Sequence, residues 1–148
     1  MKRILFIITI VLLVFSACEK KKQYSNEQKN ALNKLDGNYH AYKGKEMIYA
    51  VISFTSSYRM PIPVYEGKKV LFYKHGECFF SDYSYYIPEK GYITCYYSLS
   101  ENADVISFYY KDGENDKRLL REYGLHIENN DVFTLNDNGR ILKFEKVK

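Results

Sequence analysis

The chain has 148 residues and a formal net charge of +4, of which Lys2 and Arg3 in the first 17 residues supply +2. The remaining 131 residues are enough for one domain but too few for two with proper cores, and their charge of +2 gives no case for a nucleic-acid partner. Sixteen Tyr and nine Phe with no Trp suit half-buried strands rather than a disordered chain, so the composition favours an aromatic-rich β domain.

The first 18 residues have the pattern of a secretory signal peptide. Lys2 and Arg3 precede an apolar run from Ile4 to Phe15, and Ser16-Ala17-Cys18 ends it. The run is shorter than the ~20 residues that a membrane-spanning helix needs, so a cleaved signal peptide, residues 1–17, is the better interpretation. The ending Phe15-Ser16-Ala17-Cys18 resembles the lipobox of bacterial lipoproteins. That resemblance implies cleavage before Cys18 and acylation of this cysteine.

Residues 18–25 are expected to form a lipidated tether ahead of a single domain at residues 26–148. The segment from Glu19 to Ser25 can reach at most about 24 Å from the anchor. Its lysines at 20–22 are either a solvated linker or a source of attraction to anionic lipid, at about 1 kcal/mol each. In Bacteroidota-type lipoproteins an acidic run after the cysteine accompanies export to the cell surface. The basic run here favours an anchor in the outer membrane that faces the periplasm.

A short helix is expected to open the domain, with short strands after it. Ser25 and Gln28 match a capping box and Asp36-Gly37 provides a stop, which predicts a helix from about Asn26 to Lys34. Beyond Gly37, aromatic and β-branched runs alternate with turn residues. These runs predict strands near Asn38–Lys43, Met47–Thr55, Lys69–Lys74, Glu77–Ser81, Tyr92–Ser98, Val105–Lys111, Leu119–Ile127, Asp131–Leu135 and Arg140–Lys146.

The connections between these strands predict how they pair. Hairpin turns are expected at residues 74–76, 89–91, 100–102, 112–115, 129–130 and 136–139. No helix-length segment separates two strands, so the sheet is expected to be an antiparallel meander. Pro61 and Pro63 exclude a central strand from Ser56–Glu66, which is expected to be a loop, an edge or a lid. Closure would hide the edges, so we predict an all-β fold, an antiparallel barrel of about eight or nine strands.

Two segments resemble lipocalin-like domains. Leu35-Asp36-Gly37-Asn38-Tyr39 resembles the Leu-x-Gly-x-Trp entry into their first strand, and residues 123–147 resemble the last three strands of small bacterial (Bacteroidota-type) lipoproteins with such a domain. The resemblance covers nearly all of the mature chain and implies a lipocalin-like barrel. It also implies that Gly37 and Tyr39 close one end, with Tyr39 in place of the family's tryptophan, and that Arg140 packs across the Tyr39 ring.

Motifs for catalysis and metal binding are absent from the sequence. It has no Gly-x-Ser-x-Gly elbow, no His-Glu-x-x-His pair and no phosphate-binding glycine loop. His40, His75 and His126 lie on separate predicted strands and turns without metal-ligand spacing, and are expected at the surface or rim. Residues 112–116 have oxygens that suit calcium but lack EF-hand spacing, and a hairpin tip explains them. We therefore expect no enzyme, no cofactor and no metal site.

Cys78 and Cys95 are an even pair in a chain that is expected to enter an oxidising compartment. They lie opposite each other only if a long loop, about Tyr83–Lys90, joins their strands. A disulfide is then geometrically possible and would contribute roughly 3 kcal/mol. A tight turn at residues 89–91 would instead leave the two cysteines about three places out of step, as free buried thiols.

Tyrosines gather around the long loop and on the strands predicted next to it. The residues expected to contact a ligand or partner are Tyr58, Tyr83, Tyr85, Tyr86 and Tyr97. Their rings would stack on an amphipathic ligand and their hydroxyls would orient it. The alternative is that tyrosine fills a small barrel that has no Trp, with hydroxyls reaching solvent at the rims. Strand neighbours point to opposite faces, so at most half of these side chains can line one cavity.

We expect an envelope-anchored protein that binds rather than catalyses. One hypothesis is a lipoprotein that binds a small hydrophobic or amphipathic ligand in or at the mouth of the barrel, formed by Ser56–Glu66 and Ser81–Lys90. The other is a periplasmic inhibitor or immunity lipoprotein that blocks an envelope-attacking enzyme through the tyrosine-rich loop. A large open cavity would favour the first hypothesis, and a filled interior with exposed tyrosines would favour the second.

Overall fold

The computed structural model describes residues 22–43, 47–56, 58–82, 92–111 and 117–148. Helix α2 (Asn26–Leu35) begins as predicted and ends one residue later than Lys34. Ser25 Oγ accepts a hydrogen bond from the Gln28 N–H at 3.0 Å, and Gln28 Oε1 accepts one from the Ser25 N–H at 3.0 Å. The predicted capping box is therefore formed.

Ten strands occupy the rest of the described chain. Nine of them coincide with the predicted runs to within about two residues at each end, and the tenth, β3, lies in the proline-containing segment. The strands are β1 (Gly37–Lys43), β2 (Met47–Thr55), β3 (Ile62–Glu66), β4 (Lys69–Lys74), β5 (Gly76–Asp82), β6 (Tyr92–Leu99), β7 (Val105–Tyr110), β8 (Leu119–Ile127), β9 (Val132–Asp137) and β10 (Arg140–Lys146).

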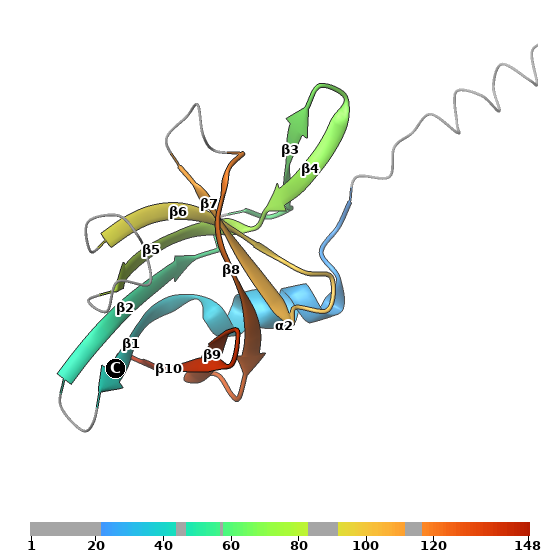
Figure 1. Ribbon diagram of the computed structural model, residues 1–148. Coiled ribbons are helices and arrows are strands. Elements are labelled where there is room, and N and C mark those ends of the chain that lie inside the picture. The colour runs from blue at the N-terminus through green and yellow to red at the C-terminus, as the bar shows by residue number, and fades with distance from the viewer. Residues whose placement is uncertain (1–21, 44–46, 57, 83–91, 112–116) are drawn as a thin grey trace, which may run out of the picture.

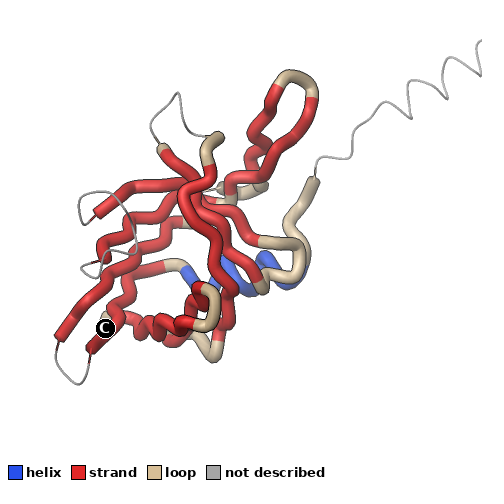
Figure 2. Tube along the Cα trace, viewed as in Figure 1, coloured by secondary structure: helices blue, strands red, loops and turns tan. Residues whose placement is uncertain are grey.

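Eight strands close into an antiparallel barrel in the order β1-β10-β9-β8-β7-β6-β5-β2. Along the chain each barrel strand pairs with the next one, and β1 pairs with both β2 and β10, which completes the ring. Figures 1 and 2 show these strands wrapped around one interior, with α2 against one end. The predicted antiparallel meander and its closure are confirmed, with eight strands in the ring.

The other two strands, β3 and β4, form a separate hairpin that projects from the barrel (Figure 1). Of the three alternatives for Ser56–Glu66, the edge strand is found in β3, where Pro63 has no N–H to donate to a neighbour. Two expectations are wrong. Lys69–Lys74 is a strand but not part of the barrel, and the turn at residues 74–76 is not a hairpin, because β4 and β5 belong to different sheets.

Aromatic side chains fill the interior of the barrel. Neighbouring ring centroids lie 4.9 to 6.4 Å apart, in stacked and edge-to-face pairs that suit the quadrupoles of the rings. The large buried rings are those of Tyr39, Phe54, Phe80, Tyr97, Phe108, Tyr123, Phe133 and Phe144. The inward positions of the strands thus make one continuous core, with Ala31, Leu32 and Leu35 of α2 added at one end.

The two ends of the barrel differ. At the helix end lie α2, the end of β2 and the short connections after β6 and β8, whereas β1, β5, β7 and β9 run towards the far end. Ser56 follows β2 at the helix end and Ser81 lies near the end of β5 at the far end. The described residues thus place Ser56 and Ser81 towards opposite ends, because antiparallel strands alternate in direction. Residues 83–90 of the expected mouth, Ser56–Glu66 with Ser81–Lys90, lie outside the described residues.

At the far end, the described turn between β9 and β10 has the form that its sequence predicts. Asn138 and Gly139 both have positive φ, 51° and 94°, as the central residues of a two-residue hairpin loop require.

Within the described residues, no helix is long and apolar enough to cross a membrane.

Candidate functional site

An outward-facing row of side chains crosses four strands near the far end. His40, Val51, Ser81 and Tyr92 are register partners in sequence from β1 through β2 and β5 to β6. Tyr92 is 66% exposed, the most of any large hydrophobic residue in the described chain. We call this surface, with the flanking residues Tyr42 and Phe79, the aromatic row.

Ring contacts organise the aromatic row. The ring centroids of Phe79 and Tyr92 lie 6.1 Å apart in a stacked pair, and those of His40 and Tyr42 lie 6.1 Å apart edge to face. Strand alternation explains why the Phe79 ring is exposed: Cys78 and Phe80 on either side of it point into the core, so Phe79 points outward. The sequence analysis did not single out these exposed rings, although the alternation around Phe79 contains the signal.

The tyrosines predicted as contact residues do not form one site among the described residues. Tyr97 points into the barrel and is fully buried, and its hydroxyl has no hydrogen-bond partner in the described chain. Burial raises the pKa of Tyr97 well above its usual value. Tyr58 lies at the helix end, where its carbonyl accepts a hydrogen bond from Tyr24 at 3.2 Å. Tyr83, Tyr85 and Tyr86 lie outside the described residues.

Gly37 and Tyr39, which the resemblance expected to close one end of the barrel, lie at the helix end. The Tyr39 hydroxyl donates to the Lys34 carbonyl at 2.5 Å, and its ring meets Phe133 edge to face at 4.9 Å. Burial, followed by the charges of two nearby aspartates, raises the pKa of Tyr39 to about 12. At Gly37 the φ of +128° favours glycine, and a Cβ would lie 2.9 Å from Lys146 Cε.

Arg140 does not pack across Tyr39, and this expectation is corrected. Arg140 begins β10 and pairs with Asp137 at the far end, whereas Tyr39 pairs with Lys146 at the other end of the same strand. Lys146 Nζ lies 5.5 Å from the centroid of the Tyr39 ring. The cation over the ring is therefore a lysine near the end of β10, because the antiparallel register brings that residue to the start of β1.

His75 is buried rather than at the rim, which corrects a second expectation. It links the hairpin to β5, its Nδ1 accepts a hydrogen bond from the Leu99 N–H at 3.0 Å, and its ring lies 5.3 Å from that of Tyr24. Burial, and then the positive charge of Lys22, lowers the pKa of His75 to about 4, against a smaller raising effect of a hydrogen bond with the Tyr73 backbone. The imidazole is therefore neutral at physiological pH and serves as an internal hydrogen-bond partner.

Cys78 and Cys95 are direct register partners on β5 and β6. This is the long-loop register, since β5 ends at Asp82 and β6 begins at Tyr92. In the structure both cysteines are free and buried, and Cys95 Sγ lies 3.6 Å from the Cys78 carbonyl oxygen. Burial, followed by a hydrogen bond with Cys95, raises the pKa of the Cys78 thiol.

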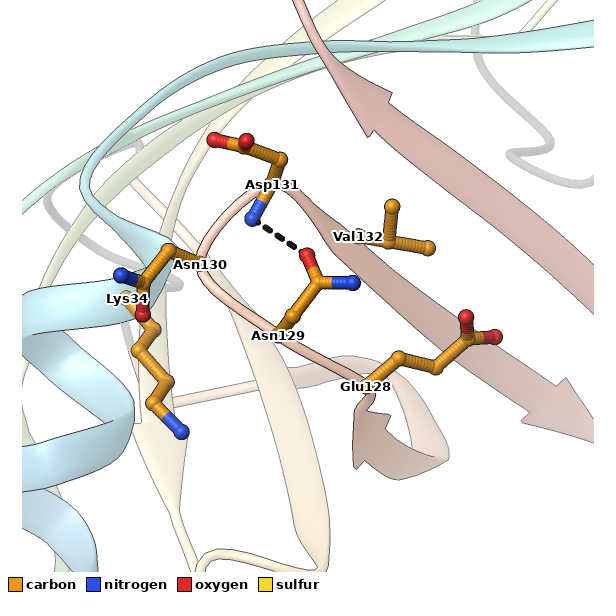
Figure 3. Close-up of a pocket in the computed structure, with 6 residues that line it drawn as sticks. All are labelled: Lys34, Glu128, Asn129, Asn130, Asp131 and Val132. Carbon is orange, nitrogen blue, oxygen red and sulfur yellow. Dashed lines mark hydrogen bonds between the residues drawn. The ribbon is translucent and has the colours of Figure 1, made fainter.

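A hollow of about 650 Å³ lies between the end of α2 and the β8–β9 turn. Figure 3 shows that the charged ends of Lys34, Glu128 and Asp131 point away from one another, while the Asn129 side chain bonds the Asp131 N–H at 2.8 Å. The Asn129 contact is a turn-stabilising bond. Because the charged groups do not converge, the hollow lacks the grouped polar atoms of a binding pocket.

Metal binding requires several ligand side chains to converge on one point. No cluster of three or more His, Cys, Asp or Glu side chains in the described ranges could hold a metal ion. The described ion pairs Lys111–Glu77, Arg121–Asp137 and Lys143–Glu128 lie on the outer surface and are at least partly exposed. Such pairs contribute little to stability and are ordinary surface features.

The fold defines the class of this protein: a closed, eight-stranded, antiparallel β-barrel with one helix at its end. Comparison with models of protein families, with characterised proteins and with solved structures found no match to the chain. Its function is argued from its own residues.

Proposed function

We propose that the chain is an envelope-anchored lipoprotein that binds a protein partner on the outside of its barrel, as a periplasmic inhibitor or immunity protein does. The observation that carries the proposal is that aromatic rings fill the interior while Tyr92, Phe79 and Tyr42 remain exposed on the aromatic row. Tyrosine supplies a large contact area with few rotatable bonds, which makes it a strong anchor in protein interfaces.

The filled interior argues against a lipid-sized ligand inside the barrel. Such a ligand needs a cavity of several hundred Å³, and the rings of Phe54, Phe108 and Phe133 are in contact across the interior, with centroids 5.8 to 6.4 Å apart. Displacing one ring would cost a few kcal/mol, as other changes to packed cores do. The outer surface is the more accessible place for a partner.

Attachment to the envelope rests on Cys18, the thiol that follows the small-residue ending of the signal sequence. Acylation with more than one chain makes membrane attachment stable. We expect Cys18→Ala to leave the protein unprocessed or to release it into the soluble fraction, measured by cell fractionation and by the mass of the product. A variant that is still processed and still needs detergent for extraction would contradict the lipoprotein assignment.

Native mass spectrometry of the mature protein, purified from its own envelope, tests the partner. We expect an adduct of protein mass that is lost from Tyr92→Ser and Phe79→Ser. The matched control is Ile141→Ser, which removes a side chain that is 65% exposed on β10, outside the aromatic row. An adduct of lipid mass on the wild type, kept by all three variants, would contradict the proposal.

A small amphipathic ligand at the barrel mouth is the second candidate. One observation favours it: the Tyr97 hydroxyl is buried without a hydrogen-bond partner among the described residues, and an unsatisfied buried hydroxyl costs about 1–3 kcal/mol. A ligand oxygen that reached this hydroxyl would recover that energy. The same spectra test this candidate, because Tyr97→Phe would then reduce an adduct of ligand mass and leave a protein adduct unchanged.

A further inference from the structure

The β3–β4 hairpin exposes an unusual share of the apolar surface. Of the ten large hydrophobic side chains that are exposed among the described residues, four lie within residues 60–71, and they are 39% to 48% exposed. These four are Met60, Ile62, Tyr65 and Leu71. Ile62 shares the face of Val64 and Phe72, whereas Tyr65 and Leu71 lie on the outward face. Exposed apolar side chains on the outward face of a projecting element indicate a contact site for another molecule or for a membrane.

Contacts with the barrel hold the hairpin in a fixed direction. The Phe72 ring stacks on Tyr109 of β7 with centroids 3.5 Å apart, and Lys74 Nζ lies 3.7 Å from the centroid of Tyr96 on β6. Within the two strands, Val64 and Phe72 are the buried side chains and face each other across the hairpin. The exposed apolar residues therefore project from a supported element rather than from a free loop.

The described end of the tether, residues 22–25, lies beside this hairpin. Lys22 Nζ lies 5.0 Å from the centroid of Tyr73 on β4, and Figure 1 shows residues 22–25 running from α2 towards the side of the barrel where β3 and β4 project. Cys18 precedes Lys22 by four residues, which span at most about 14 Å. An acyl anchor on Cys18 therefore holds the hairpin close to the membrane surface.

The charge of the hairpin complements anionic lipid. Residues 58–74 contain four basic side chains (Arg59, Lys68, Lys69 and Lys74) and one acidic side chain, Glu66. Lys68 and Lys69 lie at the hairpin tip, next to the apolar residues. Basic and apolar side chains, with tyrosine between them, are the combination that lies in the interface of a bilayer.

We propose that the β3–β4 hairpin is a membrane-contact surface that inserts Tyr65 and Leu71 into the headgroup region of an anionic leaflet. The inference rests on the proposed acylation of Cys18, which supplies the attachment, and adds the orientation of the domain. The side of the barrel formed by β6 and β7, on which the hairpin packs, then faces the bilayer. β10, on the opposite side of the ring from β6, faces away from it.

A single tryptophan tests this orientation, because the chain has no Trp of its own. The acylated protein carrying Leu71→Trp is reconstituted into vesicles of phosphatidylethanolamine and phosphatidylglycerol with brominated acyl chains, which quench nearby tryptophan. Tyr65→Trp is the second reporter, and Ile141→Trp on β10, a strand on the opposite side of the ring from β6, is the matched control. We expect about a twofold loss of fluorescence at position 71 or 65 and none at 141.

Vesicle flotation separates failure of the inference from failure of the anchor. If the protein floats with the vesicles but the three tryptophans are quenched equally, the membrane contact of the hairpin is wrong and the anchor stands. If the protein floats and none of the three is quenched, the contact is likewise wrong, and the exposed apolar residues of the hairpin would then be assigned to a protein partner. Protein that does not float would overturn the acylation of Cys18 and the inference with it.

Charge reversal tests the electrostatic part. We expect the double variant Lys68→Glu, Lys69→Glu to lose at least half of the quenching at position 71, because each lysine near an anionic surface contributes attraction. The control is Arg140→Glu, Lys143→Glu, two exposed basic side chains on β10, on the opposite side of the ring from β6; this control should keep the quenching at position 71. Equal effects of the two double variants would contradict a contact specific to the hairpin.

Discussion

At the scale of single residues, Tyr39 connects three parts of the helix end. Its hydroxyl donates to the last turn of α2 at the Lys34 carbonyl, its ring packs on Phe133 of β9, and Lys146 of β10 lies over the ring. Its own strand, β1, is the one that completes the barrel ring. Removing this side chain therefore weakens both the cap of the barrel and its closure.

We expect Tyr39→Ala to lower the free energy of unfolding by about 2–4 kcal/mol, as large-to-small changes in a core do. Tyr39→Phe keeps the ring and removes only the bond to Lys34, so it should cost about 1 kcal/mol. Urea denaturation measures both. An unfolding midpoint for Tyr39→Ala equal to that of the wild type would show that Tyr39 does not hold the helix end.

The two buried cysteines lead to a second prediction. Because Cys78 and Cys95 are direct partners, we expect a disulfide in the oxidising compartment, with two thiols giving two protons and two electrons to a disulfide donor. Burial raises the pKa of Cys78, so little thiolate forms in the folded barrel and exchange is slow there. The bridge is therefore expected to form during folding.

Thiol labelling after denaturation measures the state of these cysteines. Refolding in the presence of glutathione disulfide should protect both thiols and stabilise the domain by roughly 3 kcal/mol over the reduced form. Folded, reduced protein given the same reagent should stay labelled at both positions. Two reactive thiols in protein taken directly from the envelope would contradict the prediction.

Several single-residue roles escaped the sequence analysis because they depend on register. Tyr96 and Tyr97 are neighbours of the same type, and the direction of each follows from Cys95 pointing inward. The Tyr39–Lys146 contact needs the β1–β10 pairing, which joins segments over one hundred residues apart. The local sequence pattern shows that side chains alternate between two faces, but it does not show which of two adjacent tyrosines faces the core.

At the scale of elements, the helix and nearly all the strands are predictable because their signals are local. Capping residues, alternating apolar residues and turn residues each act within a few positions. The position of β4 is not predictable in this way, because a sequence such as Lys69–Lys74 has the same strand pattern in a barrel as in a hairpin outside it. Its place depends on Phe72 packing on Tyr109, a contact between distant segments.

The capping box of α2 provides the prediction at this scale. We expect Ser25→Ala to cost about 1 kcal/mol of stability, because Ser25 Oγ accepts from Gln28 and donates to the Glu101 carbonyl at 2.7 Å. Asn26→Ala, in the next and exposed position, is the control and should stay within about 0.5 kcal/mol of wild type. Thermal unfolding of the two variants compares them directly. Equal shifts would argue against the cap as a stabilising feature.

At the scale of the whole molecule, His75 lies where the barrel, the hairpin and the tether meet. Its Nδ1 accepts from Leu99 at the end of β6, its ring contacts Tyr24, and the charge of Lys22 acts on it. Protonation at Nδ1 would break the bond to Leu99 and place a buried charge beside a lysine. The junction therefore depends on a neutral imidazole, which links the stability of the domain to pH.

The folded pKa of about 4 lies below the ordinary histidine value of 6.5, so the unfolded chain binds the proton more readily. Stability from this group is complete above pH 6.5 and declines as the pH falls towards 4, by up to about 3 kcal/mol. We expect His75→Asn, whose amide oxygen replaces Nδ1 as acceptor, to unfold with a smaller dependence on pH in that window, whatever its stability at neutral pH. Urea midpoints from pH 7 to pH 4 give the two slopes. Parallel slopes for variant and wild type would assign the pH dependence to other groups and would remove His75 from the account of how the barrel, the hairpin and the tether are joined.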